Sequence, residues 1–273
     1  MNFRSKLKGF YKRLIFRLSA GNNPLYTGYY RYFYYPEPGT LDHFTSEFSR
    51  LHKGLTVVQI GANDGIHNDP IHRYIKRDKW RGVLLEPLPD VFAKSLEPLY
   101  RRQKGIVTVN AALDHNDGTS SIYRVAFSDS RWATGLTSFN RKILEGAIAS
   151  GYIAKQAAKE GTTLPQTTDE YIREEKIECL SVNTLLKRYD IDKVDWLQID
   201  TEGYDFEIIK IFNIEVTKPT VIVYENLHLS KETQDECRRH LTGNGYMVRD
   251  FGPNTLAARD LPDKLDLFFT LES

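Results

Sequence analysis

The feature that most constrains the fold of this chain is a short apolar run that ends in a glycine turn. Residues 56–60 are rich in β-branched side chains and lead directly into Gly61-Ala62-Asn63-Asp64-Gly65. A segment of helical character at residues 70–79 and a second apolar run, Val83-Leu84-Leu85, follow. Two short apolar runs joined by a helix predict neighbouring parallel strands, because a parallel pair needs a crossover connection.

The alternation of apolar runs with helical segments continues through most of the chain. Further strands are expected at residues 106–112, 120–126, 194–199 and 220–224, and helices at residues 92–101, 182–189, 203–212 and 231–241. Ser181 is a suitable N-cap for the helix at 182–189. Residues 246–249 and 265–271 predict an antiparallel end of the sheet. The predicted fold class is α/β: a Rossmann-like, seven-stranded, mostly parallel sheet with an antiparallel C-terminal strand, in a domain spanning residues 51–273.

Residues 127–178 interrupt this rhythm. They carry patches rich in Ser, Thr and Gly, a helical pattern at residues 142–159 and no clear strand alternation. We interpret them as an insertion that covers the binding site of a substrate, here called the acceptor, because long segments on a rigid sheet often select the substrate. The alternative is a solvated loop with a packing helix. Side chains suited to a sugar are Trp132, Thr134, Ser138, Asn140 and Arg141.

Composition bounds the class of protein. The 273 residues include 37 Lys and Arg against 36 Asp and Glu, so no overall field favours nucleic acid. Cys179 and Cys237 lie far apart, with no histidine or second cysteine at metal-site spacing, which predicts neither a zinc site nor a disulfide framework and favours a reducing compartment. No apolar run approaches the ~18 residues of a membrane span. A cytoplasmic protein with one catalytic domain is expected.

Residues 1–50 form an extension with a basic part and an aromatic part. Apolar residues recur at helical spacing between Phe3 and Leu18, basic residues mostly occupy the other face, and no acidic residue precedes Glu37. We favour packing of the apolar stripe of this helix on the domain. The alternative is a peripheral contact of residues 3–18 with an anionic membrane or a partner surface. The aromatic residues at 26–35 either pack on the core, which we favour, or stack on sugar rings.

The glycine turn and the acid after the second apolar run predict a cofactor site. Gly61 and Gly65 permit positive φ and close backbone approach to a ligand, and Glu86 lies where a carboxylate can accept hydrogen bonds from ribose hydroxyls. A dinucleotide enzyme prefers G-x-G-x-x-G, and Asp64 would repel a pyrophosphate. S-adenosylmethionine, which has no phosphate and carries a positive sulfonium, suits the turn better. A tight turn that binds no ligand is the remaining interpretation.

Several separate motifs make the chain similar to one known family over most of residues 55–250. They are Val58-Gln59-Ile60-Gly61-Ala62-Asn63-Asp64-Gly65, Leu85-Glu86-Pro87, Asn110-Ala111-Ala112-Leu113, Trp196-Leu197-Gln198-Ile199-Asp200-Thr201-Glu202-Gly203-Tyr204-Asp205 and Val223-Tyr224-Glu225-Asn226. In these motifs the chain resembles the FkbM-type methyltransferases. The resemblance implies S-adenosylmethionine as cofactor and methylation of oxygen, typically on hydroxyl groups of sugars or of natural-product scaffolds.

The resemblance also implies roles for individual residues. It places the turn around the methionine end of the cofactor, Glu86 on the ribose, and Ala111 or its neighbours beside the adenine. The cofactor contacts expected overall are Gly61, Ala62, Asn63, Asp64, Gly65, Glu86, Pro87, Ala111, Ala112 and Asp200. One departure is visible: Ser181-Val182-Asn183-Thr184-Leu185 stands where many members carry Thr-Leu-Asp. The helix is expected to persist, but an acid is missing there.

Three acids at strand ends and one histidine are the candidates for chemistry. Asp200, Glu202 and Glu225 follow the predicted strands at 194–199 and 220–224, and such strand ends converge on the ligand crevice of a doubly wound sheet. Asp200 or His228 is the expected base for an acceptor hydroxyl, with Glu202 and Glu225 orienting the acceptor or compensating the sulfonium charge. Alternatively Glu202 caps the following helix, and His228 is an inert surface residue. The same acids could hold a divalent cation, although no metal is predicted.

These observations favour an S-adenosylmethionine-dependent O-methyltransferase acting on a small-molecule or glycan acceptor. A nicotinamide-dependent oxidoreductase is disfavoured by the glycine spacing and by Asp64. A non-catalytic module docked to a membrane or partner through its basic N-terminal helix is the alternative from another class. The retained carboxylates at the strand ends argue against it.

Overall fold

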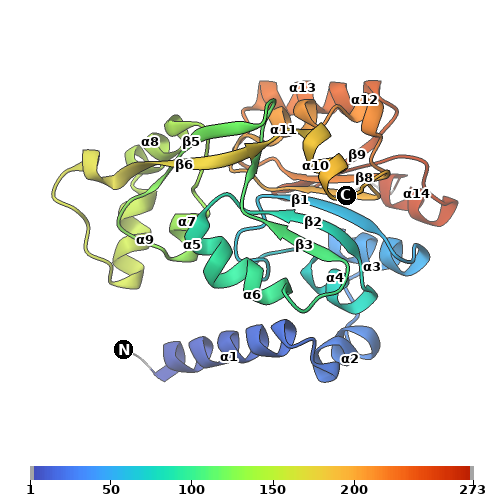
Figure 1. The fold of residues 1–273 in the computed structure, drawn as a ribbon, viewed down its shortest axis with the longest axis horizontal. Helices are drawn as coiled ribbons and strands as arrows, with labels where there is room; N and C mark the ends of the chain where they lie inside the picture. Colours follow the sequence, from blue (N-terminus) through green and yellow to red (C-terminus); the bar gives the residue numbers. More distant parts are fainter. Residues whose placement is uncertain (1–2, 271–273) are drawn as a thin grey trace.

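A seven-stranded sheet forms the centre of the computed structural model, which describes residues 3–270 and, for residues 3–6 and 8, the backbone alone (Figure 1). Its strands are β1 (Thr56–Ile60), β2 (Arg81–Leu85), β3 (Ile106–Val109), β7 (Trp196–Ile199), β8 (Val221–Glu225), β9 (Met247–Phe251) and β10 (Asn254–Ala258). The strand order is β3-β2-β1-β7-β8-β10-β9, and β10 alone runs in the opposite direction to the other six strands. The predicted Rossmann-like class is confirmed.

Helices cover both faces of this sheet. On one face lie α3 (Leu41–Leu51), α4 (His72–Asp78), α6 (Glu97–Tyr100) and α14 (Asp263–Thr270), and on the other lie α10 (Val182–Arg188), α11 (Asp205–Ile211) and α13 (Lys231–Gly243). Neighbouring residues of β1 alternate between the faces: Val57 packs with the first group and Val58 with the second. All five β1 residues are buried, as is typical of a parallel strand covered on both sides.

A second sheet joins the insertion to the domain. It consists of β4 (Ala112–Leu113), β5 (Gly118–Val125) and β6 (Ile172–Leu180), in the order β4-β6-β5. Between β5 and β6 the chain forms the helices α7 (Arg131–Thr134), α8 (Arg141–Ala149) and α9 (Tyr152–Glu160). Two predictions were wrong here. The insertion ends in a strand, and the helix expected at 142–159 is two helices, because Gly151 adopts a left-handed φ of 74° between them.

The C-terminal strand was assigned to the wrong residues. Residues 265–270 belong to helix α14, whose buried Leu265 and Phe268 are spaced for one helical face, and Leu271 lies outside the described residues. The antiparallel strand is β10, whose sequence Asn-Thr-Leu-Ala-Ala has little β-branched character. It forms because β8 and β9 offer hydrogen-bonding edges on both sides.

The remaining helical elements differ from expectation mainly in their ends. The helix predicted at 92–101 is α5 (Pro89–Val91), a π-helical turn η1 (Phe92–Leu96) and α6 in succession. Short elements η2 (Thr168–Tyr171) and α12 (Ile214–Thr217) complete the described part of the chain. Ser181 caps α10 as predicted, because its hydroxyl accepts a hydrogen bond from the backbone N–H of Thr184.

Helices α1 (Phe3–Ala20) and α2 (Pro24–Tyr32) lie along one border of the molecule, next to α6 and α4 respectively (Figure 1). Of the aromatic residues at 26–35, only Tyr26 is buried, so the expected packing of this group on the core holds for one member. Tyr30 and Tyr34 are half-buried beside the Arg73 guanidinium. Among the described residues, no helix has the length and apolar character needed to cross a membrane. The boundary after residue 50 stays a prediction.

Candidate functional site

The turn after β1 is held tightly against two neighbouring strand ends. The backbone N–H groups of Gly61 and Ala62 both donate to the Leu85 carbonyl at the end of β2. A Cβ at Gly61, where φ is 77°, would lie 1.9 Å from the backbone oxygen of Asp200. Only glycine fits this position, because both the left-handed conformation and the close approach exclude a side chain.

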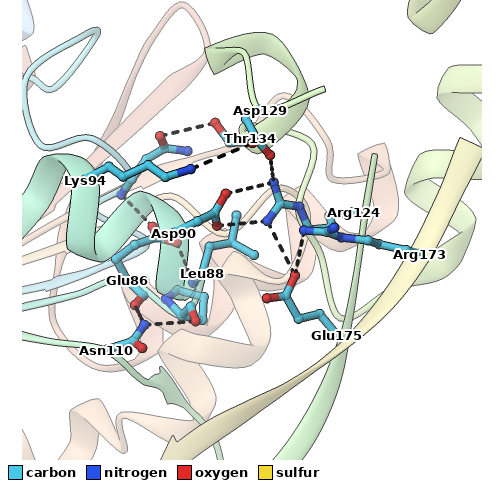
Figure 2. Close-up of polar contacts among 12 residues, drawn as sticks. Glu86, Leu88, Asp90, Lys94, Asn110, Arg124, Asp129, Thr134, Arg173 and Glu175 are labelled. Carbon is cyan, nitrogen blue, oxygen red and sulfur yellow. Dashed lines mark hydrogen bonds and ion pairs between the residues drawn. The ribbon is translucent and has the colours of Figure 1, made fainter. Parts of the chain in front are cut away.

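Glu86 lies directly after β2 and is almost fully buried. One carboxylate oxygen accepts a hydrogen bond of 2.7 Å from the Asn63 N–H, and the other accepts one of 2.8 Å from the Leu88 N–H. Asn110 donates its side-chain amide to the Glu86 and Pro87 carbonyls, which fixes this corner (Figure 2). Burial raises the pKa of Glu86 to about 7, although both N–H groups favour the ionised form.

A pocket opens between the turn, Glu86 and the insertion. Of the residues predicted to contact a cofactor, seven line it: Gly61, Asn63, Glu86, Pro87, Ala111, Ala112 and Asp200. Further lining residues come from the insertion and from β7 and its loop, and they include Arg131, Thr134, Ser138, Phe139, Thr201 and Glu202. The pocket therefore stands at the carboxyl ends of β1, β2 and β7, where ligands of doubly wound sheets bind.

The other three predicted contacts lie elsewhere in the turn. The Asp64 carboxylate accepts hydrogen bonds from the Ile66 and His67 N–H groups and lies 2.7 Å from His67 Nδ1, so it shapes the turn instead of lining the pocket. Gly65, with φ of 72°, packs against Leu96 and the neighbouring helix. Ala62 faces a larger cleft on the far side of the turn.

The acids after β7 and at the end of β8 meet around one histidine. His228 Nε2 lies 3.0 Å from a Glu202 carboxylate oxygen and 3.8 Å from a Glu225 carboxylate oxygen. Glu202 adopts a left-handed φ of 51°, which is unusual for a residue with a Cβ. One ligand atom each from Glu202, Glu225 and His228 fall within 4.8 Å of one another. The structure thus brings together the residues predicted for chemistry.

Burial and mutual repulsion disturb the ionisation of this cluster. Burial, together with the nearby charges of Glu202 and Glu225, holds the pKa of Asp200 well above its ordinary value. Burial and Glu202 raise the pKa of Glu225 to about 7. The hydrogen bond to Glu202 raises the pKa of His228 and so favours the protonated ring. Such displaced values are typical of functional sites.

Asp205, at the start of α11, positions these acids and was not predicted as a site residue. Its fully buried carboxylate accepts hydrogen bonds from the N–H groups of Thr201, Gly203 and Glu225 at 3.3–3.4 Å. It therefore joins the loops that follow β7 and β8. Helix α11 has Tyr204 at its N-cap and no side-chain cap, so the capping role alternatively given to Glu202 is wrong. The signal was its place two residues after Gly203, where a first-turn acid is favourable. Burial raises the pKa of Asp205 to about 6.

Arg131 is a second residue that sequence reasoning missed. It lies in α7 and lines both the pocket and the larger cleft. Its charge lowers the pKa values of Glu86, Asp200 and Glu225 against the stronger effect of their burial. Within residues 3–270 its buried Nε atom has no hydrogen-bond partner. Arg131 is therefore the cation that the insertion places over the acids.

The sugar-binding side chains proposed for the insertion divide into two groups. Three lie at the cavities: Thr134 and Ser138 line the pocket, and Trp132 lines the cleft, with its indole N–H donating to Glu160 at 2.9 Å. The Ser138 hydroxyl also donates to the Glu202 carbonyl. The other two serve helix α8, since Asn140 caps it and Arg141 pairs with Glu145.

A buried arginine fixes the second sheet over the pocket (Figure 2). The Arg124 guanidinium, fully buried on β5, lies 2.9 Å from Asp90, 2.8 Å from Asp129 and 3.4 Å from Glu175. These partners come from α5, from the loop before α7 and from β6. Because charge-assisted hydrogen bonds to a buried guanidinium are strong, Arg124 ties the insertion to the helix that follows Glu86.

The larger cleft begins where the pocket ends. It has a cavity volume of about 1070 Å³ and extends between the insertion helices, the loop after β8 and Lys12 of α1. Five residues line both cavities: Gly61, Arg131, Gly135, Asp200 and Glu202. Asp200 and Glu202 therefore lie at the junction of a small pocket and a wide cleft, and group transfer between two bound molecules requires such a junction.

A doubly wound sheet with a glycine turn after β1 and an acid after β2 defines the Rossmann-like fold class. A family model described as the methyltransferase FkbM domain matches residues 59–248. The chain belongs to this family of S-adenosylmethionine-dependent methyltransferases.

Solved structures with low similarity were also found. A methyltransferase FkbM from Methylobacillus flagellatus KT is 14% identical with a TM-score of 0.44, and the match covers 76% of this chain and 43% of that one. This chain thus spans less than half of its length. A precorrin-6y C5,15-methyltransferase from Geobacter metallireducens GS-15 is 13% identical (TM-score 0.40; 84% and 95% covered). A delta-N METTL16 methyltransferase domain is 10% identical (TM-score 0.40; 90% and 99% covered). A search of curated proteins found no match.

Proposed function

We propose that this protein transfers a methyl group from S-adenosylmethionine to a hydroxyl oxygen of a sugar-containing or natural-product acceptor, with Asp200 as general base. The observation that carries the proposal is that Asp200 lines both the pocket and the cleft. A base at this junction can reach an acceptor that enters from the cleft while the cofactor occupies the pocket.

The residues of the pocket fit the cofactor. Glu86 offers a carboxylate for ribose hydroxyls, the Gly61 backbone leaves room where a Cβ would collide, and Ala111 and Ala112 offer an apolar wall for the adenine. The Arg131 guanidinium, placed over the acids, would bind the carboxylate of the methionine end. Bound S-adenosylmethionine supplies a methyl group on a positively charged sulfur, and the C–S bond breaks as the acceptor oxygen takes the methyl.

The geometry favours Asp200 over His228 as the base. The hydrogen bond to Glu202 raises the pKa of His228 and favours its protonated form, which has no free lone pair for the acceptor proton. The pKa of Asp200 lies well above its ordinary value, which brings it toward the operating pH where general bases work best. Glu202 and Glu225, whose charges the imidazolium partly balances, orient the acceptor hydroxyl and favour a positive charge nearby.

A polar and aromatic cleft supports the acceptor class. Trp132, Tyr152 and His228 offer ring faces, and Gln198, Asn254 and Lys142 offer hydrogen-bonding groups along its walls. Sugar rings and hydroxylated scaffolds need this combination of stacking and polar contacts.

The metal alternative is tested by chelation: we expect methyl transfer to persist in EDTA, whereas loss of activity with recovery on adding Mg²⁺ would assign Glu202, Glu225 and His228 to a cation.

The decisive test begins with calorimetric titration of S-adenosylmethionine into the wild type, with NAD as the control ligand. Binding of the former alone, lost in Glu86→Ala, supports the pocket assignment. The loaded protein is then incubated with a panel of hydroxylated acceptors and a cofactor labelled in its methyl group. Transfer of label to oxygen in the wild type, and none in Asp200→Asn, supports the whole proposal. Absence of binding by either ligand would overturn it.

A further inference from the structure

The first half of α1 exposes a continuous apolar stripe. Leu7, Phe10, Tyr11 and Leu14 are spaced for one helical face, and their exposed fractions are 58%, 59%, 62% and 42%. A surface helix that packs its stripe on its own domain buries such residues. Here the domain covers the end of the helix instead, where Ser19 is buried and Leu18 and Ala20 are half-buried.

Helix α2 and the residues after it expose a second apolar group. Leu25, Tyr29, Tyr32 and Phe33 again recur at helical spacing, and more than half of each side chain is exposed. Tyr35 is exposed as well. We call the four exposed apolar residues of α1 and this second group together the N-terminal apolar surface. Exposed apolar groups on two helices in contact, unlike scattered single residues, mark interaction sites.

Polar contacts fix both helices to the domain, so the surface is held in place. The Ser19 hydroxyl lies 2.9 Å from His72 Nε2, and His72 Nδ1 lies 2.7 Å from the Tyr100 hydroxyl. The Asn22 side chain donates to the Arg102 carbonyl and accepts from Lys76. Arg31 donates to the Arg77 carbonyl. These contacts leave the apolar side chains facing away from the core.

The charge around this surface has one sign. Residues 1–36 contain seven basic and no acidic residues, whereas the rest of the chain contains 30 basic and 36 acidic residues. Lys12, Arg13 and Arg17 are exposed on the same helix as the apolar stripe. An apolar face with tyrosines and flanking cations is complementary to an anionic bilayer, where apolar groups enter the acyl boundary and cations face the lipid phosphates.

We propose that the N-terminal apolar surface binds the protein peripherally to an anionic lipid bilayer. Lys12 connects this surface to the site, because it lines both the acceptor cleft and the groove between α1 and the domain. The inference about membrane binding is independent of the proposed reaction.

Vesicle co-sedimentation of the full chain tests the proposal. The probes are vesicles of phosphatidylcholine containing phosphatidylserine and vesicles of phosphatidylcholine alone. Wild type is expected to partition about tenfold or more in favour of the anionic vesicles, and added salt weakens the binding. Leu7→Ser/Phe10→Ser/Leu14→Ser lowers the partition coefficient about 100-fold, and Arg13→Glu/Arg17→Glu lowers it about tenfold or more.

Matched controls lie on other elements. Val216→Ser/Leu267→Ser removes exposed apolar side chains of α12 and α14, and Lys187→Glu/Arg239→Glu reverses exposed charges of α10 and α13. Both control variants are expected to bind as the wild type does. Failure of the wild type to bind, equal binding to both vesicles, or equal loss in the controls would overturn the proposal. A soluble dimer that dissociates in the Leu7→Ser/Phe10→Ser/Leu14→Ser variant and ignores vesicles would overturn it too, and would assign the surface to a second copy.

Discussion

Two acids at the same edge of the central sheet lie in opposite surroundings. Glu86, after β2, is buried alone and accepts a backbone N–H on each carboxylate oxygen. Asp200, after β7, is half-buried beside Glu202, Glu225 and Asp205, and repulsion from these acids adds to the effect of desolvation on its pKa. The first arrangement satisfies its carboxylate and presents it to a ligand. The second leaves charge in excess, which a bound cationic group or a transferred proton relieves.

The difference arises from the local backbone. The turn after β1 directs the Asn63 N–H toward Glu86, because Asn63 adopts a positive φ of 47°. The corresponding N–H groups after β7 and β8 are taken by Asp205, which leaves the neighbouring acids without them. Within residues 3–270 a buried Glu225 oxygen has no hydrogen-bond partner. Under the proposed function, the strand end at Glu86 binds the cofactor and the strand ends at Asp200 and Glu225 serve proton transfer.

Replacing Asp200 by Asn is expected to have the largest effect of the changes that test this comparison. The amide keeps the size of the side chain but cannot accept the acceptor proton, so the rate of methyl transfer is expected to fall about 100- to 10,000-fold. Cofactor affinity measured by calorimetry stays within a few-fold, because the Glu86 side of the pocket is untouched. Asp192→Asn, at an exposed position, is the matched control. Full activity in Asp200→Asn would remove this residue from the mechanism.

Replacing Glu86 by Ala should give the complementary result. The variant loses the ribose acceptor and leaves the Asn63 and Leu88 N–H groups unpaired, so cofactor affinity falls about 10- to 100-fold. Saturating cofactor restores most of the transfer rate, since Asp200 is intact. Melting temperature measured with and without ligand separates weak binding from unfolding. If Glu86→Ala lowers the transfer rate at saturating cofactor but leaves cofactor affinity unchanged, Glu86 would serve the reaction and not cofactor binding.

Most of this comparison could be predicted from the sequence, because it depends on strand ends. Glu86, Asp200 and Glu225 each follow a short apolar run, and parallel topology brings the carboxyl ends of such strands to one edge. The glycine turn was predictable for the same reason. Which residues of the turn face the pocket was not predictable. Whether Asp64 faces the pocket or accepts hydrogen bonds from its own loop depends on backbone angles that the order of residues does not determine.

The contribution of the insertion could not be predicted. Arg131 reaches the acids because Arg124 and the pairing of β5 with β6 fix the segment between them. Strand β6 carries charged residues on both faces, so the period-two pattern that identifies a strand is absent. Similarly, β10 is a strand through its neighbours more than through its own residues. Contacts distant in sequence determine these elements.

The pH dependence of cofactor binding sharpens the comparison further. With a pKa of about 7, Glu86 is mostly protonated at pH 6 and mostly ionised at pH 8. Because the ionised form accepts the ribose hydrogen bonds, affinity for S-adenosylmethionine is expected to rise up to about tenfold over this range. Calorimetry on Glu86→Gln, whose side chain does not titrate, should show a flat profile. A profile that stays steep in this variant would place the titrating group elsewhere, with the Asp200 cluster as the source.

The smallest expected effect is on stability, and it tests the excess charge directly. The pKa of Glu225 rises from 4.5 to about 7 on folding, so the folded state favours the protonated acid. Stability is then lost as pH rises from about 4.5 through 7, because the folded chain holds the extra proton in that window. Glu225→Gln avoids this loss and should be about 1 kcal/mol more stable than wild type at pH 8, with no difference at pH 4. Urea unfolding at both pH values measures it, with the exposed Glu236→Gln as control. Equal stability at pH 8 would mean that His228 and Arg131 already neutralise the cluster, and the contrast with Glu86 would then be one of geometry alone.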